Sequence, residues 1–86
     1  MDKLISISQL SYKLNLISPN NKKPKNYILR YWEKEFKQIK PKIFNGNRRY
    51  YDHENIKIIE KIHFLLKDQG MTINGVKKIL NNKEPL

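Results

Sequence analysis

Four stretches of the chain carry apolar residues at helical spacing, and a single stretch over residues 39–51 interrupts them with a pattern that suits a β-hairpin. Pro41 prevents a helix from running through this stretch. Asn45-Gly46 supplies the positive φ angles that a tight two-residue hairpin turn requires. Since 86 residues suffice for one domain, we expect a single, mainly α domain over 1–86 with about four helices and one small hairpin.

The N-terminal half predicts two helices joined by a loop. Ser6 and Gln9 have the spacing of a capping box, which predicts a helix over about 7–14. Residues 15–25 contain two prolines and three asparagines and are expected to form a loop. A second helix is expected from about Lys25, with basic residues on one side and apolar residues on the other. The apolar side consists of Ile28, Leu29, Trp32 and Phe36.

The C-terminal half predicts two more helices. Asp52 is a good N-cap for the longest one, and Gly70 can close that helix in the left-handed conformation. Thr72 can cap a last helix that leaves Lys77 and Lys78 outside. Its apolar face consists of Ile73, Val76, Ile79 and Leu80. The tail over residues 81–86 is expected to be frayed.

The composition excludes several kinds of protein. Without cysteine, neither disulfides nor thiolate metal ligands can hold the fold, so burial of apolar side chains must do so. No apolar run is long enough to cross a membrane, and the N-terminus lacks the pattern of a signal peptide. We therefore expect a cytoplasmic protein, and its charge suggests association with the nucleoid.

The charge is concentrated in one part of the chain. The net charge is +10, and residues 22–49 carry +8 of it, with only Glu33 and Glu35 opposing the cations. Such a charge opposes compaction unless a polyanion is nearby. Nucleic acid is therefore the first partner to consider.

Catalysis finds little support. The chain has two histidines and no glycine-rich phosphate loop, so we expect no enzyme activity, cofactor or metal. Asp52, His53 and Glu54 are neighbours on a helix, point about 100° apart and favour helix capping over metal binding. His63 lies on an apolar helix face, where a buried neutral histidine is the plain interpretation and a pH-sensing role the alternative. Trp32 and Phe36 suit core packing better than base stacking.

Tyrosines adjoin the cations at two places. Tyr27 and Tyr31 flank Arg30 one helical turn apart, and Tyr50-Tyr51 follows Arg48-Arg49. Phosphate binding uses this mixture, because cations attract the DNA backbone and hydroxyl donors set the register. The alternative is that the basic side chains are merely solvated.

These motifs resemble the mercury-resistance-regulator (MerR) family of winged helix-turn-helix transcription factors. Residues 29–33 (Leu-Arg-Tyr-Trp-Glu) resemble the second-helix signature, residues 47–51 (Asn-Arg-Arg-Tyr-Tyr) the wing, and residues 70–80 the start of the fourth helix. The resemblance implies a helix-turn-helix over about 6–37, a wing over about 39–51 and two further helices over about 52–81.

The resemblance also implies a binding mode. Family proteins insert the second helix into the major groove, and the wing contacts neighbouring backbone and minor groove. Dimers bind an inverted repeat in a promoter or operator and affect RNA polymerase. Together with the tyrosine and cation pattern, this gives an expected DNA-binding set of Lys25, Asn26, Tyr27, Arg30, Tyr31, Lys34, Lys42, Asn47, Arg48, Arg49 and Tyr50.

Two departures from the family leave alternatives open. The segment from Ile17 to Lys25 is longer than the usual connection, and its Lys22 and Lys23 are either phosphate contacts or solvated. The family's coiled-coil dimerisation helix and effector region are absent, so the chain is either an excised domain or a short protein. The alternatives are an excisionase-like DNA-bending protein, a basic module that docks an acidic protein, and an RNA-binding adaptor. Exposed aromatic residues on a sheet face, expected for the RNA adaptor, are not evident in the sequence.

Overall fold

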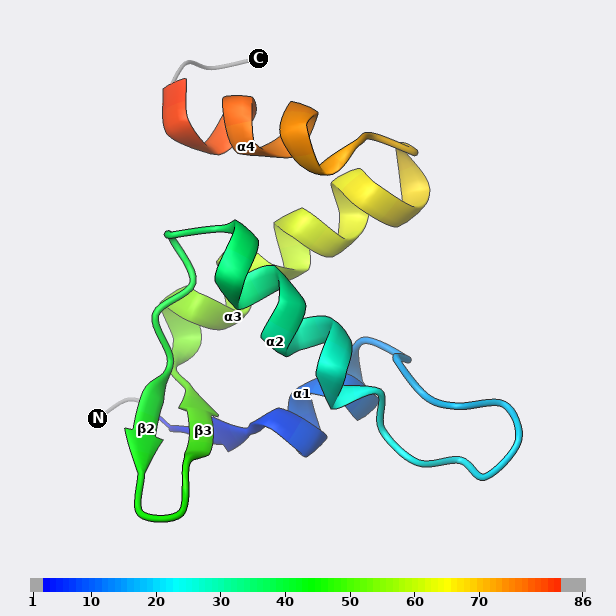
Figure 1. Ribbon diagram of the computed structural model, residues 1–86, viewed down its shortest axis with the longest axis vertical. Coiled ribbons are helices and arrows are strands. Elements are labelled where there is room, and N and C mark those ends of the chain that lie inside the picture. Colours follow the sequence, from blue (N-terminus) through cyan, green and yellow to red (C-terminus); the bar gives the residue numbers. More distant parts are fainter. Residues whose placement is uncertain (1–2, 83–86) are drawn as a thin grey trace.

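Residues 3–82, which the computed structural model describes, form a mainly helical domain with a small sheet at one end (Figure 1). The sheet and the short first helix occupy one end of the molecule, and the last helix lies at the opposite end. Two central helices run between these ends. The expected fold class, mainly α with a hairpin wing, is confirmed.

The sheet has three strands, whereas the sequence predicted only a hairpin. The hairpin strands are β2 (Lys42–Phe44) and β3 (Arg48–Tyr51), and the unexpected strand is β1 (Ile5–Ser6). The strand order is β1-β3-β2, with all pairs antiparallel, so β3 is central. β1 has only two residues, too few for a visible alternation of apolar and polar positions.

The hairpin turn differs from the expected two-residue turn. Phe44 pairs with Arg48, so three residues form the loop, and the positive φ angles fall on Gly46 (78°) and Asn47 (59°), not on Asn45. Asparagine tolerates the left-handed region better than most residues, because its short polar side chain can form local hydrogen bonds. The second asparagine therefore permits the longer turn.

The first two helices are α1 (Ile7–Lys13) and α2 (Asn26–Glu35). The capping box is confirmed: the backbone N–H of Gln9 donates to Ser6 Oγ, and the backbone N–H of Ser6 donates to Gln9 Oε1. The long connection between α1 and α2 is a loop whose two ends are held together. Ile17 and Pro24 form an antiparallel bridge, and the Lys25 N–H donates to the Leu16 carbonyl. Its extra length therefore projects outward and leaves the two helices adjacent (Figure 1).

The third helix, α3 (His53–His63), continues as a π-helical segment, η1 (Phe64–Asp68), and Gly70 ends it with a φ of +64°. The Gly75 N–H donates to Thr72 Oγ1 at the start of α4 (Ile73–Asn82), as expected for a cap. Lys78 is exposed, as expected, whereas Lys77 is half-buried, with its Nζ 2.7 Å from Glu35 Oε1 of α2. None of the helices in the described range is long and apolar enough to span a membrane.

The expectation of a frayed tail was wrong for its first two residues. Asn81 and Asn82 belong to α4, and Gln38 Nε2 donates to Asn81 Oδ1 at 2.7 Å. Residues 83–86 lie outside the described residues. The long-range hydrogen bond could not be inferred from the local sequence.

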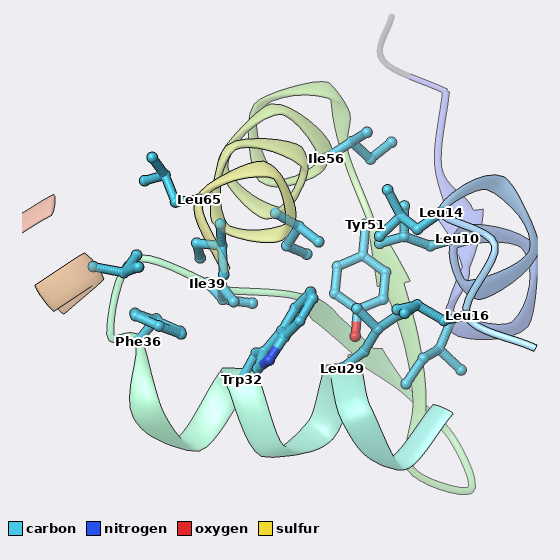
Figure 2. Close-up of a cluster of buried hydrophobic side chains, with 14 residues drawn as sticks. Leu10, Leu14, Leu16, Leu29, Trp32, Phe36, Ile39, Tyr51, Ile56 and Leu65 are labelled. Carbon is cyan, nitrogen blue, oxygen red and sulfur yellow. The ribbon is translucent and has the colours of Figure 1, made fainter. Parts of the chain in front are cut away.

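The core lies between α1, α2, α3 and the inner face of β3 (Figure 2). Tyr51 is fully buried in its centre, with its hydroxyl directed toward α2. Trp32 is buried against it from α2, and the Trp32 ring is 6.1 Å from that of the half-buried His63. The expected core roles of Trp32 and Phe36 are confirmed. Tyr51 was expected to be one of the tyrosine hydroxyl donors beside the cations, but it is a core residue.

Asp52 provides the first stability prediction. Its Oδ1 accepts hydrogen bonds from the backbone N–H and from the side-chain amide of Asn55, and Asn55 Oδ1 accepts from the Lys40 N–H. The Asn55 N–H in particular lowers the pKa of the Asp52 carboxyl below 3.8. Asp52→Ala should reduce the free energy of unfolding by about 1 kcal/mol at neutral pH, measured by urea denaturation.

The lowered pKa fixes the pH dependence of this cap. A carboxyl with a lower pKa in the folded state stabilises the fold above its unfolded pKa, and this contribution disappears as pH falls through the folded pKa. The difference between the wild type and Asp52→Ala should therefore shrink below pH 3.8. Asp52→Asn is the matched control, since asparagine also caps helices but does not titrate. An undiminished difference in acid would refute the assignment.

Tyr51 provides the second stability prediction. Burial, and secondarily the negative charge of Glu33, raises the pKa of Tyr51 to about 12, and its hydroxyl has no hydrogen-bond partner among the described residues. Tyr51→Phe should therefore leave the stability at pH 7 unchanged or raise it by up to about 1 kcal/mol. Denaturation can be followed by the fluorescence of Trp32.

At alkaline pH the free energies of unfolding of the wild type and of Tyr51→Phe should diverge. The unfolded tyrosine ionises near pH 10, whereas the folded one stays protonated until about pH 12, so the wild type should lose stability across this window. Tyr51→Phe should lack this loss, and Tyr27→Phe, at an exposed position, should retain it. Equal alkaline losses in all three proteins would show that Tyr51 ionises freely.

Candidate nucleic-acid interface

The solvent-facing side of α2 carries four of the predicted site residues. Because the helix buries Leu29 and Trp32 in the core, residues on the opposite side face outward. Tyr27 is 68% exposed, and Arg30, Tyr31 and Lys34 are also exposed. This face therefore combines two cations with two phenol rings and no carboxylate.

Asn26, at the start of α2, is used within the protein. Its Oδ1 accepts a hydrogen bond from Ser11 Oγ at 2.8 Å, and its Nδ2 donates to Ser8 Oγ at 3.0 Å. Both partners belong to α1, so this amide fixes the two helices to each other. Its predicted contact with DNA remains a prediction, for which the second Nδ2 proton and one lone pair of Oδ1 are left.

The wing separates its two arginines. Arg48 is exposed, whereas Arg49 is half-buried and its Nε donates to Glu33 Oε1 of α2 at 2.7 Å. Alternate residues of a strand point to opposite faces, so Arg49 and Tyr51 face the helices, and Arg48 and Tyr50 face away from them. Arg49 therefore anchors the wing, and Arg48 is available to a ligand.

A cleft of about 320 Å³ lies beside the wing, the start of α1 and the middle of α2, and its lining includes residues that were predicted separately. Its cationic side chains come from α2 and from β3, which are distant in sequence. The lining includes Ser6, Ser8, Arg30, Arg48, Arg49 and Tyr50. Guanidinium, hydroxyl and phenol groups are donors suited to phosphate oxygens.

Six predicted residues do not line this cleft: Asn26, described above, and Lys25, Tyr27, Tyr31, Lys34 and Lys42. Lys25 is half-buried as the N-cap residue of α2, and Lys34 is exposed in its last turn. Lys42 is exposed at the start of β2. Tyr27 and Tyr31 form the outer face of α2 described above. Asn47 lines the cleft through the hairpin turn.

The few carboxylates near the interface are paired elsewhere. Glu33 holds Arg49, and Glu35 holds Lys77 of α4. In the described residues no ion pair involves Arg30, Lys34, Lys42 or Arg48. Apart from the Asp52 carboxylate, whose charge interacts with Lys42, these cations on the outer side of α2 and the wing have no opposing charge paired with them in the described part of the chain.

Comparison with known proteins agrees with this geometry. Residues 5–83 match the family described as MerR HTH family regulatory proteins. The chain belongs to the MerR family. This is a non-enzymatic family of DNA-binding regulators, which agrees with the exposed cations on α2 and the wing. No curated protein and no solved structure matches the chain.

The MerR domain also exposes apolar residues that the sequence reasoning missed. Ile43 and Phe44 of the wing are 53% and 51% exposed, and Phe44 packs edge-on against Tyr50 with the ring centroids 5.3 Å apart. The expectation that no aromatic residues lie exposed on a sheet face was therefore wrong. The hairpin pattern could have shown this, since residues flanking the turn lack a core to pack against.

The anchoring of the wing can be tested with a double-mutant cycle on Glu33 and Arg49. Their side chains are each only 23% exposed, so their ion pair is better shielded than a typical surface pair. Glu33→Gln and Arg49→Gln should show a coupling of about 1 kcal/mol in the free energy of unfolding. The more exposed pair Glu35–Lys77 is the matched control and should couple more weakly. Zero coupling at Glu33–Arg49 would remove this pair as an anchor.

Proposed function

We propose that this MerR-family domain regulates transcription by binding double-stranded DNA in a sequence-specific manner. In this proposal the outer face of α2 lies in the major groove, and the wing lies on the adjacent backbone and minor groove. The observation that carries the proposal is the cleft that joins Arg30 of α2 to Arg48 and Arg49 of the wing. A continuous cationic surface over a helix and a hairpin can follow the phosphates on both sides of a groove.

Each part of the surface has its own role in the proposal. Arg30 and Tyr31 reach base edges or phosphates from α2, where an arginine can make a bidentate contact with guanine. Arg48 neutralises a phosphate beside the wing. Arg49 and Asn26 act mainly by holding the wing and α2 in place, because both already have partners in the protein.

The family suggests a larger assembly. By analogy, two copies bind an inverted repeat in a promoter or operator, and the bound complex affects RNA polymerase in the nucleoid. One domain alone then supplies half of the contacts and binds weakly. Selection of bound sequences from a random duplex pool would show whether the preferred site is single or repeated.

An RNA adaptor is the second candidate, because the exposed Phe44 and the half-buried Tyr50 form an aromatic pair on the wing. Two adjacent rings are fewer than the aromatic residues of a typical RNA-binding sheet, and the structured surface of α2 suits a major groove. Competition between a short duplex DNA and a structured RNA distinguishes the candidates. Preference for the RNA would favour the adaptor.

Salt dependence tests the duplex contact quantitatively. If about six phosphates are neutralised, the logarithm of the association constant should fall against the logarithm of salt concentration with a slope near −5, measured by fluorescence anisotropy. Arg30→Ala and Arg48→Ala should each weaken binding, and loss of one phosphate contact should make the slope shallower by about 1.

Lys78→Ala is the matched control, because Lys78 is exposed on α4, at the opposite end from the wing tip (Figure 1). It should leave affinity and slope nearly unchanged. Equal effects of Arg48→Ala and Lys78→Ala would mean that only net charge matters. Salt-insensitive binding, or no binding to duplex DNA, would overturn the proposed function.

A further inference from the structure

The outer side of the wing carries an apolar patch that the fold does not use. We define this patch as Phe44 and Tyr50. Phe44 is 51% exposed, although it is among the larger apolar side chains of the domain. Ile43, which is 53% exposed, is opposite Arg49 and so borders the patch from the other face of the hairpin. Core packing therefore does not explain an exposed phenylalanine beside the hairpin turn.

Cross-strand register places cations within the patch. Phe44 is opposite Arg48, and Lys42 is opposite Tyr50, so these four side chains share one face of the hairpin. The Phe44 and Tyr50 rings meet edge-to-face at an interplanar angle of 74°. The face thus alternates aromatic rings with positive charges.

The patch is continuous with the proposed DNA surface. An open hollow of about 590 Å³ is lined by Ile43, Phe44, Asn45, Arg48 and Tyr50. Arg48 and Tyr50 also line the cleft beside α2. The turn with Asn45, Gly46 and Asn47 is the part of the wing that joins the two hollows, and it is small and polar.

The charges around the patch indicate its occupant. No carboxylate occurs between Phe36 and Tyr51, while the cations Lys42 and Arg48 border the apolar side chains. β2 is an edge strand and could pair with a second copy, but the two copies would bring like charges together. A minor groove offers phosphates to the cations and apolar sugar walls to the rings.

We infer that Phe44, supported by the adjacent ring of Tyr50, is an apolar contact to the minor groove of duplex DNA, with Arg48 and Lys42 on the flanking phosphates. This inference rests on the proposed function and adds a contact that charge alone does not provide. An apolar side chain pressed into the minor groove partly unstacks a base step and bends the duplex. The wing then favours sequences that deform easily, in addition to any bases read by α2.

The test compares Phe44→Ala with Arg48→Ala on the same short random-sequence duplex. Phe44→Ala should weaken binding about tenfold and leave the salt slope unchanged, because no phosphate contact is lost. Arg48→Ala should weaken binding as well but, unlike Phe44→Ala, should make the salt slope shallower by about 1. Phe64→Ala is the control, since Phe64 is 48% exposed on η1, away from the wing, and should bind like the wild type.

Two further measurements complete the test. Energy transfer between dyes at the ends of the duplex should report a smaller bend with Phe44→Ala than with the wild type. Sedimentation without DNA should be identical for the two proteins. Wild-type affinity and bending by Phe44→Ala would overturn the inference and leave the proposed function intact. A change in self-association caused by Phe44→Ala, with unaltered DNA binding, would also overturn the inference and leave the proposed function intact. Failure of the wild type to bind duplex DNA would overturn both.

Discussion

Attachment of the wing to the helices by β3 is the interaction on which the rest of the surface depends. Tyr51 extends from this strand into the centre of the core, and Arg49 is paired with Glu33 of α2. Because strand residues alternate, the same strand directs Arg48 and Tyr50 outward. One short strand therefore both fixes the wing and presents its ligand-facing side chains, so that a loss of anchoring would also displace the arginine beside the cleft.

The pair α1 and α2 is stabilised differently, by polar side chains. Asn26 accepts from Ser11 and donates to Ser8, which sets the spacing of the helices at the end nearest the cleft. The long connection between them does not disturb this arrangement, because its two ends are joined by backbone hydrogen bonds and Leu16 is buried beneath them. The long connection therefore forms a projecting loop, and the helix pair keeps its contacts.

Electrostatics links stability to binding in this domain. A net charge of +10 on 86 residues raises the free energy of the compact state by mutual repulsion. The two carboxylates of α2 reduce this repulsion locally by pairing with Arg49 on the inner side of the wing and with Lys77 on α4. The outward cations Arg30, Lys34 and Arg48 form no ion pair among the described residues, and a bound polyanion would relieve their repulsion.

Much of the fold and part of the site followed from sequence. The capping box at Ser6, the caps at Asp52 and Thr72, and the left-handed Gly70 were predicted correctly, because each depends on a few neighbouring residues. The apolar stripe of α2 likewise placed Trp32 and Phe36 in the core, and charge clustering indicated a nucleic-acid partner. Strand β1 was missed, since two residues carry no periodicity.

The amino-acid sequence by itself determined the helices, the hairpin and the concentration of charge, since local hydrogen bonding and side-chain periodicity act over a few residues. Only the tertiary structure decided which cations face solvent and which are anchors. Arg48 and Arg49 are chemically alike and adjacent, and their roles differ because α2 brings Glu33 to one face of the strand and leaves the other open. Partners distant in the sequence set that difference, and no local pattern records them.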